Sequence, residues 1–220
     1  MHRAYLVRTV LAASVAFSGH VAGADAGKAA KPPAPRTDVL NQFTLDTAIK
    51  RHNATRNDIK GFVAEIRSVG PTVCKEEESD GSGFPGTDAV ATRVDREVTA
   101  LRRYNSQLKT FLSLVKKAKL PASTKDRKAA NADLALGEGI LDDVTPQHDA
   151  EFDKWDSITV AIRSHACDSF ASAVQAAADA AESSWNDEAG GLFRLERALD
   201  RVEGHTPSKH GTAEPASPYR

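Results

Sequence analysis

Apolar residues along this chain recur at alternating spacings of three and four, which places them on one face of an α-helix. The clearest stripe runs from Val94 to Val115, and a similar one runs from Leu45 to Ile66. Alternating apolar and polar runs bounded by turn dipeptides, which would indicate strands, are scarce. The pattern predicts an all-α protein, an antiparallel helical bundle of about four long helices plus a short C-terminal helix.

Helix-stopping and capping residues set the expected ends of these helices. The first helix is predicted over residues 37–69, because Gly70-Pro71 follows its apolar stripe. Thr87-Asp88 is a natural cap for the second helix. A third, weaker helix is expected to start at Ser123, where Asp126 three positions later resembles a capping box.

Two topologies are open for the remaining part of the domain. Thr145-Pro146 fits a cap followed by a proline in the first turn, so we favour a separate fourth helix that starts there. In the alternative, Pro146 only kinks one long helix, and that helix carries Cys167 back towards Cys74. Gly190-Gly191 is expected to separate the short last helix from the fourth.

The chain has two cysteines, Cys74 and Cys167. In an oxidising compartment an isolated pair is more often bridged than free, so a structural disulfide is predicted. A redox pair normally has the spacing Cys-x-x-Cys, which is absent here. Closing a loop of roughly 100 residues would contribute roughly 4–5 kcal/mol in the chain-entropy model, as an upper-end figure.

The N-terminal residues have the three parts of a cleaved export signal. Arg3 and Arg8 precede an apolar run over residues 9–17, about half the length that a membrane-spanning helix needs, and Ala-x-Ala sites follow. No later segment is apolar enough to span a bilayer, so we expect a secreted or periplasmic protein without a transmembrane segment after cleavage. The expected parts are a signal peptide over 1–24, a flexible leader over 25–36, the bundle domain over 37–203 and a disordered tail over 204–220.

Charge is nearly balanced, with a formal net charge of -1, so the basic excess that nucleic-acid binding requires is missing. The charges are nevertheless segregated, because residues 98–125 are basic and free of acids whereas residues 133–156 are rich in acids. In the favoured topology this segregation gives the bundle a basic end, suited to an acidic partner or a lipid headgroup, and an acidic end. The simpler explanation, which we favour, is that helices carry charged outer faces in any case. The acidic end is a candidate cation site made of Glu76, Glu77, Glu78, Asp142, Asp143 and Asp149.

Three polar residues, His52, Arg56 and Asn105, occupy positions on the apolar stripes. In a bundle core such residues form either a hydrogen-bonded polar layer or a set of ligands for a metal or cofactor. We favour the polar layer, because neither a Glu-x-x-His pair nor a haem-attachment motif occurs. The alternative is a metal- or cofactor-binding bundle that uses His52, His148 or His165 with nearby acids.

Motifs of catalysis are missing from the sequence, which has no Gly-x-Ser-x-Gly, His-Glu-x-x-His, Walker or EF-hand pattern. His165 and Cys167 are two residues apart, so on a helix they would point in different directions and could not act as a base and its nucleophile. We therefore expect an exported, non-enzymatic bundle without a cofactor that binds a protein or a cell-envelope component. The partner and the oligomeric state are left open by the sequence.

Overall fold

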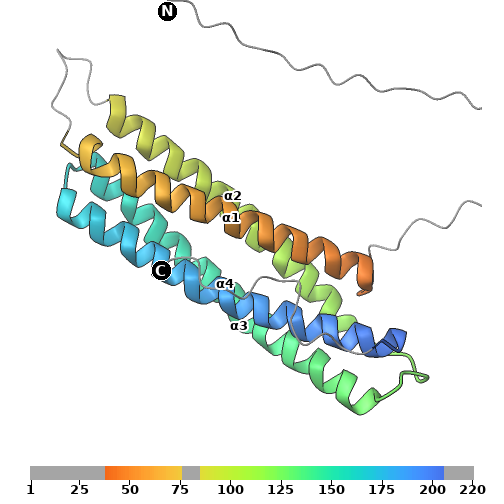
Figure 1. The fold of residues 1–220 in the computed structure, drawn as a ribbon. Coiled ribbons are helices and arrows are strands. Elements are labelled where there is room, and N and C mark those ends of the chain that lie inside the picture. The colour runs from red at the N-terminus through yellow and green to blue at the C-terminus, as the bar shows by residue number, and fades with distance from the viewer. Residues whose placement is uncertain (1–37, 76–84, 206–220) are drawn as a thin grey trace, which may run out of the picture. The chain divides into compact units, whose positions relative to one another are not determined.

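The computed structural model describes residues 38–75 and 85–205. These residues form four long helices and no strand: α1 Gln42–Val73, α2 Pro85–Lys117, α3 Arg127–Arg163 and α4 Cys167–Glu203 (Figure 1). The predicted all-α helical bundle is confirmed. The expected signal peptide, the leader and all but the first two residues of the expected tail lie outside the described residues.

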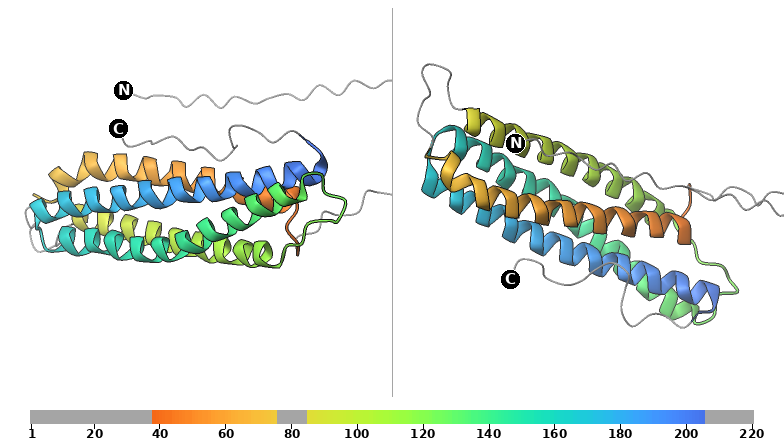
Figure 2. Two further views of the ribbon diagram at one scale, coloured as in Figure 1. Left: turned by 90° about the horizontal axis from the view of Figure 1, so that it is seen from below. Right: turned by 45° about the horizontal axis from the view of Figure 1, so that its top comes forward.

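Consecutive helices run antiparallel, and the four pack in a ring in which α4 closes back onto α1 (Figures 1 and 2). The interface between α3 and α4 is the most extensive, and that between α1 and α2 is the least extensive of the four neighbouring pairs. Within the described residues, none of the helices carries an apolar stretch long enough to cross a bilayer.

α3 continues without a break through Pro146, so the favoured start of a separate helix at Thr145-Pro146 is wrong and the alternative topology is correct. Proline has no N–H to donate to the carbonyl of Asp142, four residues earlier. The Thr145 hydroxyl donates to that carbonyl instead, over 3.3 Å. Figure 2 shows that α3 bends along its length, which is how a helix accommodates an interior proline.

Because α3 is a single helix, Cys167 lies at the same end of the bundle as Cys74. The two form the predicted disulfide, with their Cα atoms 5.5 Å apart. Cys74 caps the end of α1 and Cys167 is the first residue of α4, so the bridge ties these two helix ends together. His165 lies in the turn between α3 and α4, with a left-handed φ of 53°.

Two helices differ from their predicted ends for local reasons. α1 passes Gly70-Pro71 and ends at Val73, and Gly70 has a packing role, since a Cβ there would lie 2.0 Å from Cε1 of Phe170. α3 begins at Arg127 rather than near Ser123, because Asp126 takes a left-handed φ of 51° and makes no side-chain cap.

The separate short last helix is not observed, since α4 continues through Gly190-Gly191 to Glu203. Glycine costs a helix about 1 kcal/mol relative to alanine, which did not suffice to break it. Gly191 instead lets α3 approach closely, because a Cβ at Gly191 would lie 3.0 Å from Cδ2 of Leu141 on α3. The residues predicted for the short helix therefore form the C-terminal part of α4.

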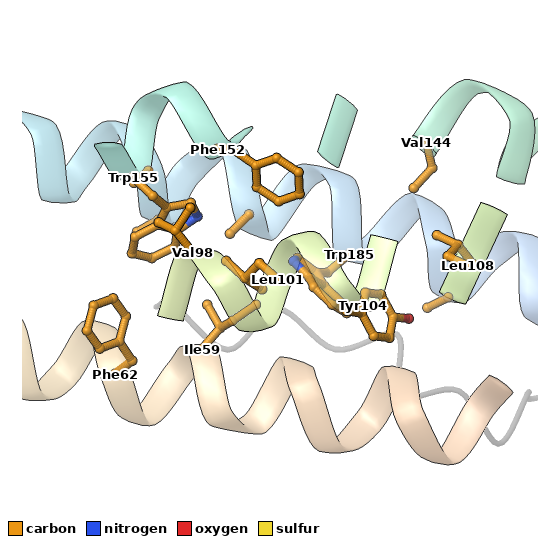
Figure 3. Close-up of a cluster of buried hydrophobic side chains, with 14 of the residues drawn as sticks. Ile59, Phe62, Val98, Leu101, Tyr104, Leu108, Val144, Phe152, Trp155 and Trp185 are labelled. Atoms are coloured by element: carbon orange, nitrogen blue, oxygen red, sulfur yellow. The ribbon is translucent and has the colours of Figure 1, made fainter. Parts of the chain in front are cut away.

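The core contains aromatic and aliphatic side chains from all four helices (Figure 3). Trp155 of α3 and Trp185 of α4 are its largest buried side chains. Tyr104 of α2 packs beside Trp185, with ring centroids 4.8 Å apart. The apolar stripes of the sequence therefore do face one common core.

Candidate functional site

The three polar residues predicted on the stripes are all buried, with His52, Arg56 and Asn105 at 0%, 1% and 2% exposure. They do not share one set of partners. Arg56 donates to Oδ1 of Asn186 over 2.8 Å. Asn105 donates to the Thr145 carbonyl over 3.0 Å and also to Asp149. His52 joins a larger polar cluster.

That cluster is centred on Glu188 of α4, which is fully buried. The hydroxyl of Tyr104 on α2 donates to one carboxylate oxygen of Glu188, and Nε2 of His148 on α3 lies 2.9 Å from the other. Nδ1 of His52 on α1 lies 3.1 Å from Glu188 Oε1, although the angle is poor for a hydrogen bond. One carboxylate therefore contacts polar groups from the three other helices.

The cluster extends from His148 to a second buried carboxylate. Nδ1 of His148 lies 3.1 Å from Oε2 of Glu151, one turn further along α3. Glu151 also accepts hydrogen bonds from Nε1 of Trp155, over 2.9 Å, and from the Ser184 hydroxyl, over 3.1 Å. We call His52, Tyr104, His148, Glu151 and Glu188 the buried network.

Sequence reasoning missed Tyr104, Glu151 and Glu188 as polar members of the core. A signal existed for Glu188, which lies three residues after Trp185 and four before Leu192, both of which face the core. A charged residue at such a position needs a buried partner, and only the folded chain shows that His148 supplies it.

The buried network carries charge at neutral pH. Burial alone would lower the pKa of His148, but the hydrogen bonds and negative charges of Glu151 and Glu188 outweigh burial and raise it to about 9. Burial alone would raise the pKa of Glu188, but His148 and His52 lower it to about 2. Burial and the neighbouring Glu188 carboxylate raise the pKa of Tyr104 well above its ordinary value. An imidazolium therefore lies between two carboxylates inside the bundle.

The alternative prediction of a metal site named His52, His148 and His165. His52 and His148 both approach Glu188, but His165 lies at the disulfide end, with Nδ1 3.4 Å from the Cys74 carbonyl oxygen. Within residues 38–75 and 85–205, no group of three or more His, Cys, Asp or Glu side chains is arranged to hold a metal ion. Both nitrogens of His148 instead face carboxylates at hydrogen-bonding distance.

The described part of the expected acidic end does not lie at an end of the bundle. Asp142, Asp143 and Asp149 lie in the middle of α3, because that helix does not stop at Pro146. Glu76, Glu77 and Glu78 lie outside the described residues. Because α3 is continuous, Asp142, Asp143 and Asp149 do not mark an end of the bundle, and the cation site at an acidic end stays a prediction.

The segregated charges face each other along the sides of α2 and α3. Three basic residues of α2, spaced by seven, pair with three acids of α3 with the same spacing. N···O distances are 3.0, 2.7 and 2.6 Å, and exposed pairs of this kind each contribute about 0–1 kcal/mol. The segregation of charge along the sequence is therefore explained by ion pairs between the antiparallel helices α2 and α3. The pairs are Arg102–Asp156, Lys109–Asp149 and Lys116–Asp142.

A groove of about 410 Å³ lies between the first half of α1 and the second half of α2. Its one charged side chain is Arg51, which is exposed and, among the described residues, forms no ion pair with a carboxylate. Phe43 is 47% exposed at its rim. The groove is lined by Phe43, Thr44, Thr47, Arg51, Gln107, Thr110, Phe111 and Leu114.

The inner side of this groove adjoins the buried network. A small cavity of about 30 Å³ shares Arg51 and Phe111 with the groove and is also lined by Tyr104. The Tyr104 hydroxyl is held by Glu188, so the position of this ring is fixed from inside the bundle. The groove could not be predicted from the stripes, because it depends on how closely α1 approaches α2.

The groove and the buried network are thus two features of the described chain that could serve a function. The groove offers an accessible cation beside apolar side chains, and the network gives its inner side a fixed shape. Comparison of the chain with protein-family models, with curated proteins and with solved structures finds no match.

Proposed function

We propose that this protein is exported and binds an amphipathic anion, a small molecule with an apolar part and a carboxylate, sulfonate or phosphate, in the groove between α1 and α2. The observation that carries this proposal is the Arg51 guanidinium, which has no carboxylate partner among residues 38–75 and 85–205 and lies in a groove that none of their acidic side chains lines. A cation in such a position attracts a negatively charged group.

The size and the lining of the groove support a ligand of this kind. Its volume of about 410 Å³ is within the range of about 300–1,000 Å³ that is usual for small-molecule sites. Phe43 is 47% exposed, so an apolar ligand that covers it would gain about 25 cal/mol for each Å² removed from water. The Gln107 amide lies in the same groove and could donate a hydrogen bond.

The compartment supports a ligand from the cell envelope. The Cys74–Cys167 disulfide is typical of proteins in oxidising compartments, and the sequence predicts a cleaved export signal. Secretory and periplasmic proteins meet amphipathic anions at the envelope. The proposal makes the earlier expectation of an envelope partner specific, because it names the surface and the chemistry of what is bound.

The proposal is tested with 1-anilinonaphthalene-8-sulfonate, an aromatic anion whose fluorescence rises in an apolar site. We expect saturable binding that weakens about tenfold or more in Arg51→Gln, since hydrogen bonds to charged groups contribute about 1.5–3 kcal/mol. Phe43→Ser, at an exposed position, should also weaken binding. Arg96→Gln, an exposed arginine elsewhere on α2, is the matched control and should bind like the wild type. Equal affinities of Arg51→Gln and the wild type would refute the proposal.

A further inference from the structure

A second hollow, of about 470 Å³, lies at the end of the bundle where α1 begins and α2 ends. Leu114 lines both this hollow and the groove, so the two adjoin at that residue. The hollow is largely apolar, with Leu40, Leu120, Leu199 and Val202 among its lining residues. We call it the end hollow.

Resting on the function proposed above, we infer that the ligand is a monomeric, single-chain acyl anion. Its head group binds at Arg51, and its chain runs along the groove, over Leu114, into the end hollow. The two hollows together provide what such a molecule needs, a cation at one place and an apolar path leading away from it.

The charges around the two hollows decide the direction of the chain. In the part of the chain that the structure describes, Arg51 is the only charged residue that lines the groove. The end hollow also has cations, Lys117 and Lys119, but Asp38 and Glu203 line the same hollow and oppose an anionic head there. The head group is therefore favoured at Arg51 and the apolar chain in the end hollow.

The distance between the two hollows sets the length of the chain. Arg51 and Asn41, which lines the end hollow, are separated by about ten residues along α1. At 1.5 Å per residue this is roughly 15 Å, the length of an extended chain of about twelve carbons. A shorter chain would leave the end hollow unfilled, and a longer one would emerge into water.

The surface around the groove favours a free molecule over a lipid within a bilayer. Asp46 and Lys50 lie beside the lining residues of α1, and both are exposed. Charged groups in these positions resist insertion of this face into the apolar part of a membrane. The ligand would thus be taken up from water, one molecule at a time.

The test is a titration calorimetry series of saturated carboxylates from hexanoate to hexadecanoate, each below its micelle-forming concentration. We expect the affinity to rise by up to about fourfold per added methylene group, as burial of each group predicts. The rise should stop near dodecanoate. An affinity that does not depend on chain length, or that still rises at hexadecanoate, would overturn the inference.

A substitution in the end hollow separates this inference from the proposed function. Val202→Lys places a charge where the chain would end, and it should weaken dodecanoate binding about tenfold or more while leaving anilinonaphthalene-sulfonate binding unchanged. Val160→Lys is the matched control, because Val160 is 68% exposed on α3. If Val202→Lys leaves dodecanoate binding intact, the end hollow is not the chain site. The proposed function would instead be contradicted if Arg51→Gln bound both probes as tightly as the wild type does.

Vesicles provide the remaining comparison. Sedimentation with vesicles of phosphatidylglycerol and phosphatidylcholine should leave the protein in solution, and added free dodecanoate should bind it there. Arg51-dependent sedimentation with the vesicles would show that bilayer lipid is the ligand, and it would overturn the inference of a monomeric one.

Discussion

The carboxylate of Glu188 is completely buried, a position in which an ionised group requires partners for most of its oxygen lone pairs. Tyr104 and His148 supply such partners, and Nδ1 of His52 also lies close, at 3.1 Å, so that three different helices contribute. A buried ion pair adds little net stability compared with an apolar pair of the same shape, but removing one partner leaves the other uncompensated. We therefore expect the network to matter most for the unique arrangement of the helices.

Substitution of Glu188 tests this expectation. Glu188→Gln keeps the shape but removes the charge that faces His148, and we expect the free energy of unfolding in urea to fall by about 3–5 kcal/mol. Asp187→Asn changes the adjacent, exposed carboxylate and should alter stability by about 0.5 kcal/mol or less. Similar stabilities for the two variants would show that the buried charge is unimportant.

The same network predicts how stability depends on pH. The pKa of His148 is raised from 6.5 to about 9, so its contribution is complete below pH 6.5 and is lost as the pH rises through 9. The pKa of Glu188 is lowered from 4.5 to about 2, so its contribution is complete above pH 4.5 and is lost as the pH falls through 2. We therefore expect the greatest stability between these limits, near pH 4.5 to 6.5.

His148→Gln isolates the alkaline part of this profile. In the wild type, the free energy of unfolding should fall by about 1.4 kcal/mol per pH unit between pH 6.5 and 9, because one proton is bound in the folded state and not in the unfolded state. His148→Gln should remove that alkaline slope. The acidic slope, which comes from Glu188, should remain but be less steep. Urea unfolding at a series of pH values measures both, and equal alkaline slopes in the two proteins would contradict the assignment.

At the scale of the elements, two glycines on α3 provide a matched comparison. A Cβ at Gly137 would lie 2.7 Å from Cδ2 of Leu195 and 2.9 Å from the Gly191 carbonyl oxygen, whereas a Cβ at Gly139 would meet nothing within 4 Å. Gly137→Ala should therefore destabilise the protein by about 1–3 kcal/mol through overpacking. Gly139→Ala should stabilise it by about 0.5–1 kcal/mol through helix propensity.

Thermal unfolding of the two variants beside the wild type measures this difference. The two substitutions are chemically identical and lie on the same helix, so propensity alone would give both the same sign. Stabilisation by both would show that α3 and α4 do not approach each other closely at Gly137.

At the scale of the whole molecule, the disulfide links residues 93 positions apart, so it restricts most of the unfolded domain. The Cys74→Ala/Cys167→Ala double variant should lose roughly 3–5 kcal/mol of unfolding free energy, with about 4.7 kcal/mol as the chain-entropy value for a loop of this order.

Intact mass of the purified wild type should increase by about two daltons on reduction, since two S–H bonds replace one S–S bond. An unchanged mass would show that the cysteines are not bridged.

Much of the fold was predictable because the evidence for it is local. The stripes in α1 and α2 and the pairing of the cysteines required only the three-and-four period and the redox chemistry of an isolated pair. The helix ends predicted at Pro146 and Gly190-Gly191 were wrong for a physical reason. Each is a helix breaker in isolation, with a cost of about 1–3 kcal/mol, and burial of Trp155, Trp185 and their neighbours in a shared core outweighs that cost.

By itself, the sequence determined the all-α class, the faces of the helices that turn inward and the residues that form the disulfide, since each follows from spacing or residue type along the chain. Only the tertiary structure decided that α3 is one helix, that Glu188 meets His148 and Tyr104, and that Arg51 lines a groove between α1 and α2. These features join residues distant in sequence, and such contacts depend on the separation and register of packed helices, which local periodicity does not encode.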